Sequence, residues 1–475
     1  MAEKDNSWSI TLSGFQSGYS PLAFDDSLTE EGSGGHASTM QNVNVLNGKL
    51  TQGPGLSNLT GTVDESIQFI LDKATSDNVG WAFGTTKLFK ISATAVLSSS
   101  GVSGCTDGES LLALKGNLYG FYNKTSGGDI FKMPLTTETI ESAWGSTSPT
   151  GSAALQNAIH PSAGVEDIAL FGNGQYAGTY IVETNTLAPT KLDFGTGNVV
   201  ADVVYSGGYF YIAVNEGVSG ANRSEGRVFL YGGSATLSTL DDETGVGVSK
   251  IGFLYRLNSI IYVAYKDISF DDGFSIGYIL GRQIKPLTHL PGSLPTFAQK
   301  TLFKGVILAL SDGLVYAAGA MVDTLPFAGS QIADGGYATA SAIGAPFGVP
   351  LVASTDGGSN YRLAKFSGFE TAANWQSIVF PVIVGRFKGL ITSIVVLTNT
   401  LASGASCALT IQADQDSSTS STMTITTTGK RRHVFTAIGL GQIEDFMVKL
   451  DFSGGSSSNN VVIRKVIING NYVEN

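Results

Sequence analysis

The fold is decided by Leu111-Leu112-Ala113-Leu114-Lys115-Gly116-Asn117-Leu118-Tyr119-Gly120-Phe121, which combines an apolar strand, a tight turn with glycine and an aromatic-rich strand. This unit recurs, and the first apolar strands of its successive copies begin near Ile67, Leu111, Ile168, Val203, Ile251, Leu302 and Ser341. Their spacing, about 35 to about 57 residues, is close to the ~40–50 residues of one four-stranded propeller blade. One blade alone would leave an apolar face uncovered. The repetition therefore predicts an all-β fold whose sheets close into a β-propeller of about seven blades.

The composition agrees with a large body of short strands. The chain has 475 residues, of which 60 are glycine and 42% are hydrophobic, so it can bury a large core and is not predicted to be disordered. Charged residues make up only 14%, against roughly 25% in an ordinary soluble domain.

The charge balance bears on the class of partner. The net charge is −11, which argues against a nucleic-acid or anionic-membrane surface, because both need clustered Lys and Arg. Residues 370–475 contain eight Lys and Arg and seven Asp and Glu, a balance of +1, so residues 1–369 carry −12. No run of about 18 apolar residues occurs, so no membrane span is expected. The polar segment Met1–Ile10 lacks the apolar core of a signal peptide, which predicts synthesis in a cytoplasm.

Three regions follow from the changes in pattern along the chain. Residues 1–60 are predicted to be an extended N-terminal arm with a hairpin at Asn47-Gly48, because both turn positions tolerate a positive φ. Residues 61–368 carry the repeated units, interrupted by a predicted helical surface insertion at Thr136–Trp144 and Ser152–Ile159. Residues 369–475 contain short strand-like stretches separated by Ser, Gly and Thr, which predicts a C-terminal antiparallel β-sandwich.

Motifs that could carry chemistry are few. The segment 354–361 resembles the Asp-box turn of sialidase-like propellers, in which the Asp356 carboxylate would accept backbone N–H bonds within a hairpin. The string Gly273-Phe274-Ser275-Ile276-Gly277 matches a nucleophile elbow, but a strand pattern follows it where that motif needs a helix. The four histidines lie far apart, at positions 36, 160, 289 and 433. We therefore predict no catalytic residue, no cofactor and no metal ligand, and a protein that is not an enzyme. Whether an acidic loop binds Ca²⁺ stays open.

The stretches Met40–Val45, Asn47–Leu50 and Gly53–Leu56 resemble the opening of tailed-bacteriophage virion proteins, where an Asn-Val strand, a Gly turn and a Pro-Gly-Leu step introduce a β-propeller. The region from Trp375 onward is similar to the small β-domains appended to phage tail components. The chain is much shorter than the best-known tail-nozzle proteins. The resemblance implies a structural component of the virion, in the tail or head-to-tail region, that acts as a rigid multi-subunit assembly module. Its implied partners are other virion proteins and copies of itself.

A docking role follows for the arm. We expect Val43, Val45, Pro54 and Leu56 to dock on an adjacent subunit, because an extended segment can add a strand to a neighbouring sheet. Two alternatives stay open. One is a receptor-binding tail protein that holds a host-surface glycan, and the other is a sialidase-like glycoside hydrolase. A sialidase would need an arginine cluster around its substrate, which the positions of the nine arginines do not reveal.

Overall fold

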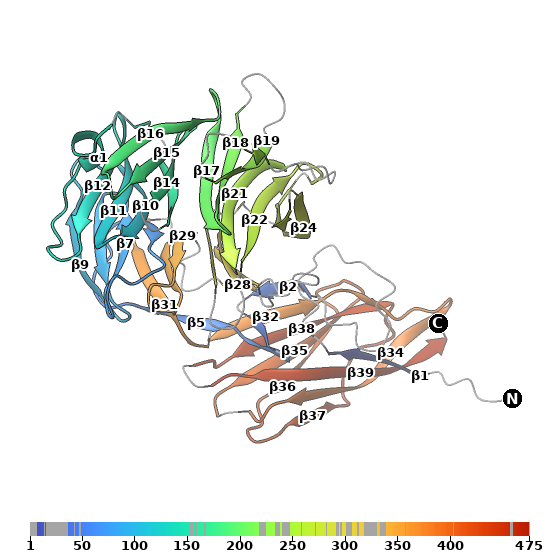
Figure 1. The fold of residues 1–475 in the computed structure, drawn as a ribbon. Coiled ribbons are helices and arrows are strands. Elements are labelled where there is room, and N and C mark those ends of the chain that lie inside the picture. The colour runs from blue at the N-terminus through green and yellow to red at the C-terminus, as the bar shows by residue number, and fades with distance from the viewer. Residues whose placement is uncertain are drawn as a thin grey trace.

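The computed structural model consists almost entirely of β-strands in successive antiparallel sheets (Figure 1). Among the residues that it describes, the one α-helix is the single turn α1 (Trp144–Thr147). The described residues are 7–13, 15, 37–41, 43–46, 49–151, 155–156, 159–165, 168–217, 225–232, 238–239, 248–257, 259–270, 272–281, 283–290, 294, 297–300, 306–310, 313–317, 330–332, 339–356, 358–369, 371–401, 403–456 and 459–474.

A first body is made of sheets that follow one another along the chain. The first four sheets are β6 (Ile67–Ile70), β7 (Gly80–Gly84), β8 (Lys87–Ile91) and β9 (Val96–Gly101); β10 (Asp107–Leu114), β11 (Asn117–Lys124) and β12 (Gly127–Pro134); β13 (Ile159–Val165), β14 (Ile168–Asn173), β15 (Tyr176–Ile181) and β16 (Thr186–Asp193); and β17 (Val199–Ser206), β18 (Tyr209–Glu216), β19 (Glu225–Tyr231) and β20 (Ser238–Thr239). Then come β21 (Val248–Leu257), β22 (Ile260–Asp267), β23 (Phe274–Leu280) and β24 (Gln283–Leu290); β25 (Phe297–Lys300), β26 (Val306–Leu310), β27 (Gly313–Ala317) and β28 (Ser330–Ile332); and β29 (Thr339–Gly344), β30 (Leu351–Thr355) and β31 (Tyr361–Phe369).

These sheets are arranged in a closed circle, which we call the ring body. The first strand of each sheet contacts the first strand of the next, from β6 through β10, β13, β17, β21 and β25 to β29, and β29 in turn contacts β6. The last sheet is completed by β5 (Pro54–Asn58), which precedes all the others in sequence and pairs with β31. The predicted all-β fold is confirmed, and the circular order gives this body the character of a β-propeller.

The stretch Leu111–Phe121 lies in the hairpin β10–β11. Lys115 and Gly116 have φ values of 44° and 74°, which is the left-handed backbone that a tight two-residue hairpin turn requires. Gly120, in the middle of β11, is needed for another reason. A Cβ there would lie 1.9 Å from Cε1 of Phe131, so only glycine leaves room for this fully buried ring. The sequence Tyr119-Gly120-Phe121 thus indicates a point in β11 where the Phe131 side chain of the neighbouring strand β12 lies across the backbone.

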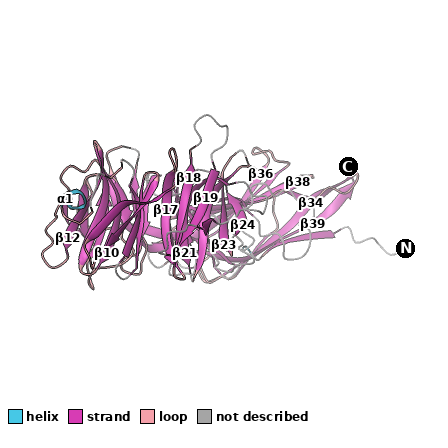
Figure 2. Cartoon of the chain, turned by 45° about the horizontal axis from the view of Figure 1, so that its top comes forward, coloured by secondary structure: helices cyan, strands magenta, loops and turns pink. Residues whose placement is uncertain are grey.

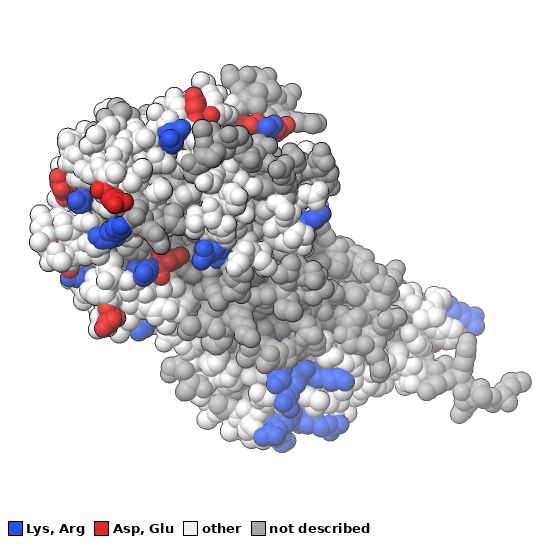
Figure 3. Space-filling model, viewed as in Figure 1, with Lys and Arg blue, Asp and Glu red and all other residues white. Residues whose placement is uncertain are grey.

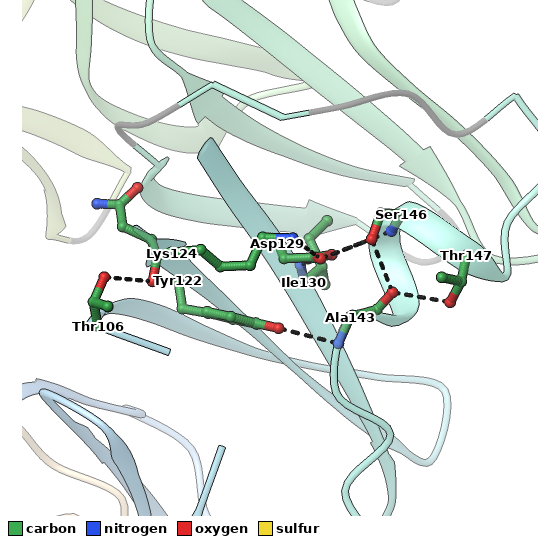
Figure 4. Close-up of polar contacts among 9 residues, drawn as sticks. Thr106, Tyr122, Lys124, Asp129, Ile130, Ala143, Ser146 and Thr147 are labelled. Atoms are coloured by element: carbon green, nitrogen blue, oxygen red, sulfur yellow. Dashed lines mark hydrogen bonds and ion pairs between the residues drawn. The ribbon is translucent and has the colours of Figure 1, made fainter. Parts of the chain in front are cut away.

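The predicted helical insertion is wrong in its extent and in its exposure. Only α1 is helical in the described part of residues 136–159, and Trp144 is buried against the core that β11, β14 and β15 share. The fully buried Asp129 carboxylate holds this turn in place (Figure 4). Its oxygens accept bonds from the Ile130 N–H (2.8 Å), the Ser146 N–H (3.1 Å) and the Ser146 hydroxyl (2.7 Å), and Lys124 Nζ lies 2.7 Å away. Because a buried carboxylate is costly without hydrogen bonds, these partners hold the α1 turn against β12.

A second body, the C-terminal body, contains two sheets. One has the order β3 (Val43–Leu46), β4 (Lys49–Gln52), β39 (Val462–Glu474), β34 (Phe387–Thr398) and β37 (Arg432–Phe435), with β1 (Ser7–Leu12) also on β39. The other is the second part of a ten-stranded sheet that begins with β25 to β28 in the ring body. It continues in the order β2 (Ala37–Gln41), β32 (Ala372–Ser377), β38 (Asp445–Ser453), β35 (Ser406–Ala413) and β36 (Ser420–Ile425), with β33 (Phe380–Pro381) also on β38. Buried side chains of both sheets form one core, separate from the cores of the ring body. Figure 2 shows β34 and β39 extending away from the ring body.

The segment predicted as an arm is built into both bodies. Strands β1, β3 and β4 belong to the C-terminal body, β5 belongs to the ring body, and β2 pairs with β28 on one side and β32 on the other. Leu12 and Phe15 are fully buried in the C-terminal core. The segment Gly32–Gly35, whose glycines predict a flexible joint, lies outside the described residues. The first 60 residues therefore link the two bodies within one chain.

Candidate interaction surface

The sheet that contains β39, β34 and β37 has one face toward the core and one face outward. Ile394 and Val396 on β34 are fully buried in the core, so their neighbours Val395 and Leu397 point to the outer face, as the two-residue period of a strand requires. The described strands do not cover this outer face with another layer, since the second sheet lies on the core side.

The register of the sheet places positive charges on the outer face. Leu397 pairs with Arg432 on one side and with Lys465 on the other, so the three side chains form a row across neighbouring strands. Strands lie about 4.8 Å apart, so the backbone positions of Arg432 and Lys465 are about 10 Å from each other along that row. The register then shifts between Leu397 and Thr398, which leaves Arg464 as an extra, exposed residue of β39. A bulge of this kind turns a side chain toward solvent.

The turn before β37 adds two more cations. Lys430 and Arg431 are exposed, and Arg431 Nε donates a hydrogen bond to the Thr400 hydroxyl at 3.0 Å. We call the five residues that gather at this end of the sheet the basic face: Lys430, Arg431, Arg432, Arg464 and Lys465. Figure 3 shows Lys and Arg side chains clustered over the part of the C-terminal body where β37 lies, with no Asp or Glu among them in that view.

The charges of the basic face differ from the other cations of the C-terminal body in their partners. Within the described residues, none of its five members has a carboxylate within ion-pair distance. The other three cations each have one: Arg386 lies 2.7 Å from Glu474, Lys388 lies 2.8 Å from Glu444, and Lys449 lies 3.2 Å from Asp451. Among the residues that the structure describes, the positive charge of the basic face is therefore not neutralised by an ion pair.

Apolar side chains lie directly beside the basic face. Val434, two residues beyond Arg432, pairs with Val395 and is 46% exposed, and Ile467 continues this apolar row on β39. On the inner side of β37, His433 is buried, and this burial lowers the pKa of its imidazole. The positive charge of Lys430 lowers the same pKa further. A face with both unpaired charge and exposed apolar area is suited to a protein partner.

The four residues predicted to dock on an adjacent subunit lie in two different sheets. Val43 is buried in the chain's own C-terminal core, and Val45 pairs with Leu50 in the β3–β4 hairpin. Pro54 and Leu56 lie on β5, and Leu56 is half-buried. The structure therefore does not bring the four together into one surface, and their docking role stays a prediction.

The Asp-box-like turn and the Gly-x-Ser-x-Gly string both lie in the ring body. The Asp356 carboxylate accepts the Gly358 N–H at 2.9 Å, which confirms the expected bonding of the β30–β31 turn. The Asn360 amide and this N–H lower the pKa of Asp356. Ser275 of the Gly-x-Ser-x-Gly string lies within strand β23, buried, with its hydroxyl 3.1 Å from His289 Nδ1.

The described residues contain no group of three or more His, Cys, Asp or Glu side chains that could hold a metal ion. None of their helices is long and apolar enough to cross a membrane.

Part of the basic face is visible in the sequence. Lys430, Arg431 and Arg432 form its one dense basic spot, a pattern that predicts a solvent-facing hairpin turn. Arg464 and Lys465 also stand next to each other in the sequence, but their proximity to Arg432 depends on the pairing of β34 with both β37 and β39. The sequence therefore shows Arg464 and Lys465 as two adjacent cations. It does not show the strand register that brings them close to Arg432.

Comparison with known proteins places the chain in no family, because no protein-family model and no curated protein matches it. Among solved structures, it is similar to the extracellular domain of a putative hybrid two-component system of B. thetaiotaomicron, at 11% identity and a TM-score of 0.49. That match covers 81% of this chain and 47% of the other, so the chain spans about half its length. The WD40 β-propeller domain of Doa1 matches at 12% identity and a TM-score of 0.43, covering 65% of this chain and 95% of that domain. PorZ of Porphyromonas gingivalis, a surface component of the type-IX secretion system, matches at 12% identity and a TM-score of 0.41, covering 71% of this chain and 44% of its own. Similarities of this size carry no argument about function.

Proposed function

We propose that this protein is a structural component of a tailed-bacteriophage virion, in the tail or head-to-tail region, where it acts as a rigid assembly module. The observation that carries the proposal is the course of residues 37–58, the segment that resembles the opening of such proteins. Its strands β2 to β5 pair with both bodies and tie them together. A module that holds neighbouring proteins in a fixed relative position needs such a rigid link between its two bodies. The partners would be other virion proteins and copies of the chain itself.

The architecture proposed with this function is a seven-bladed β-propeller joined to a β-sandwich. Each sheet of the ring body would be one blade, and β5 would supply the outer strand of the last blade and so close the circle. The two sheets of the C-terminal body would be the layers of the sandwich, since their side chains share one core. Closure by an N-terminal strand makes opening of the ring costly, which suits a particle that must resist force.

The test is the protein composition of purified particles. Particles from cells that encode this chain would be banded in a density gradient, and their proteins would be quantified by mass spectrometry. We expect the chain to be present at a fixed number of copies per particle and to stay bound after a high-salt wash. Its recovery only in the unassembled fraction, with none in the particles, would refute the virion role.

A receptor-binding role is the second candidate, and the basic face is the observation that favours it. An anionic host-surface glycan would find five cations there that have no ion pair within the described residues. The test is competition: purified chain should block particle adsorption to host cells, and a chain with Arg432→Glu and Lys465→Glu should not. Equal blocking by both chains would exclude the basic face as the glycan site.

A further inference from the structure

Strand β36 (Ser420–Ile425) forms an edge of the C-terminal body. It pairs with β35 on one side, and no described strand pairs with its other side. The unpaired backbone N–H and C=O groups of such an edge are a template for pairing with another chain. We infer that two copies of this chain associate through their β36 strands, which pair antiparallel about a two-fold axis. This contact deepens the proposed function and rests on it, because it specifies how copies of the chain meet.

The sequence of β36 leaves this edge open to pairing. Proteins usually protect an edge strand with Lys, Pro, a bulge or a very short length. The six residues of β36 include no charge and no proline, and they pair with β35 without a register shift. Strand β37, an edge of the other sheet, has only four residues and carries the charge of Arg432. Figure 1 shows β36 on the side of the C-terminal body that faces away from the ring body, where a second copy can approach it.

The side chains of β36 hold the strand in a regular position. Met423 and Ile425 are buried in the core of the C-terminal body. Thr422 and Thr424 alternate with them and are exposed on the outer face. The Thr422 hydroxyl lies 2.8 Å from the Thr410 hydroxyl, so side chains also join β36 to β35. Because the edge is already ordered, pairing with a second copy costs little conformational entropy.

The two ends of β36 carry opposite charges. Asp416 is exposed in the turn before the strand, and none of the described cations lies within ion-pair distance of it. The Ser418 N–H and hydroxyl donate to its carboxylate at 2.9 and 2.7 Å, and these bonds lower the pKa of Asp416. Lys430 and Arg431 of the basic face are exposed in the segment that follows the strand.

This distribution of charge selects the antiparallel arrangement. A two-fold axis between two antiparallel β36 strands places the start of each strand beside the end of the other. The Asp416 end of one copy then meets the Lys430 and Arg431 end of the second copy, at two equivalent places. Parallel pairing would instead bring like charges together, which is costly. The antiparallel contact therefore supplies a carboxylate to cations that have no ion pair in the described part of their own chain.

The experiment uses two variants of the full-length chain and sedimentation velocity at low salt. The plus variant carries Asp416→Lys, so both ends of its β36 are positive. The minus variant carries Lys430→Glu and Arg431→Glu, so both ends are negative. The matched control is Arg386→Glu, which reverses an exposed cation of the same body that has its own carboxylate partner, Glu474. Far-ultraviolet circular dichroism checks that each variant is folded.

The wild type and the control should form dimers. Each charge variant alone should dimerise at least about tenfold more weakly, because both contacts then join like charges. An equimolar mixture of the plus and minus variants should dimerise again, because every contact between them joins opposite charges. In 1 M salt, where the screening length falls to about 3 Å, the variants and the wild type should become alike.

Disulfide cross-linking tests whether the strand itself forms the contact. Thr422→Cys and Thr424→Cys, alone or mixed, should give a disulfide-linked dimer in at least one combination, since opposite Cβ atoms lie about 4.5–5.5 Å apart. The control is Ser99→Cys on β9, an exposed and uncharged edge strand of the ring body whose flanking turns carry no charge. The natural cysteines, Cys105 and Cys407, are buried.

Three results would overturn the inference: a wild type that stays monomeric at low salt, a mixture that dimerises no better than either charge variant alone, or cross-linking that is as strong through β9 as through β36. Virion composition is measured separately. A chain that is present in particles but monomeric in solution would refute this contact and leave the proposed function standing. A dimer that is absent from particles would refute the virion role alone.

Discussion

Glu109 is a carboxyl group in an unusual setting. It lies on β10 at the bulge between Gly108 and Ser110, and it accepts a hydrogen bond from Asn123 Nδ2 at 2.7 Å. Burial raises the pKa of Glu109 to about 7, and the negative charge of Asp107 contributes to the same shift. The side-chain oxygen Oδ1 of Asn123 is buried and accepts no hydrogen bond from the described residues. The site therefore suits a neutral side chain better than a charged one.

We expect Glu109→Gln to stabilise the protein above neutral pH. A carboxyl whose folded-state pKa is raised favours folding while it is protonated, and this contribution is lost as pH rises through about 7. Gln cannot ionise, and its amide can donate to Asn123, a hydrogen bond worth about 1 kcal/mol. The melting temperature of the variant minus that of the wild type should increase between pH 5 and pH 8.5. A difference that is constant with pH would show that Glu109 does not titrate in this range.

Gly470 provides a second prediction at the scale of one residue. A Cβ at this position would lie 2.2 Å from Cζ2 of Trp8, and 2.7 Å from the backbone oxygen of Leu390. Gly470→Ala should therefore displace Trp8 and cost about 1–3 kcal/mol, the usual range for overpacking. The control is Gly441→Ala in the same body, where nothing lies within 4 Å of the added methyl. Urea unfolding, followed by tryptophan fluorescence, measures the stability of both variants. Equal midpoints would contradict the close approach of Trp8 to Gly470.

At the scale of elements, the sequence was informative where contacts are local. The hairpin β10–β11 could be predicted because its turn and both its strands lie within Asp107–Lys124. The pairings that place β1 on β39 and β5 on β31 could not, since each joins residues more than 300 positions apart. Such pairings depend on which apolar faces meet in the folded chain. The proximity of Arg464 and Lys465 to Arg432 could not be predicted for the same reason, because the row forms only when β34 pairs with both β37 and β39.

The closing strand β5 can be tested at Leu59, the residue that follows it. The Leu59 N–H donates to the Leu363 carbonyl at 2.8 Å, and both side chains are buried in one core of the ring body. Leu59→Ala removes packing alone, at a cost of up to about 2–5 kcal/mol. Leu59→Pro removes the N–H as well, so it should cost at least about 1 kcal/mol more. Calorimetry on the two variants gives the difference, and equal stabilities would mean that this hydrogen bond does not hold the closure.

At the scale of the whole molecule, the two bodies have separate cores and are joined by few pairings. Strand β2 pairs with β28 through Gln41 and Gln331, and β5 enters the ring body directly after β4 leaves the C-terminal body. The four tryptophans divide evenly: Trp81 and Trp144 lie in cores of the ring body, and Trp8 and Trp375 lie in the C-terminal body. Fluorescence can therefore follow each body by itself.

We expect two unfolding transitions in guanidinium chloride. Proteins with separate cores commonly deviate from two-state behaviour, so the two tryptophan pairs should report different midpoints. One chain would keep Trp81 and Trp144, and the other would keep Trp8 and Trp375, with Phe at the replaced positions. Leu12→Ala, which truncates a fully buried side chain of the C-terminal core, should lower that body's stability by about 2–5 kcal/mol. The ring-body transition should not move, because Leu12 does not belong to its cores. Coincident shifts in both reporters would show instead that the strands of the N-terminal segment couple the two bodies into one cooperative unit.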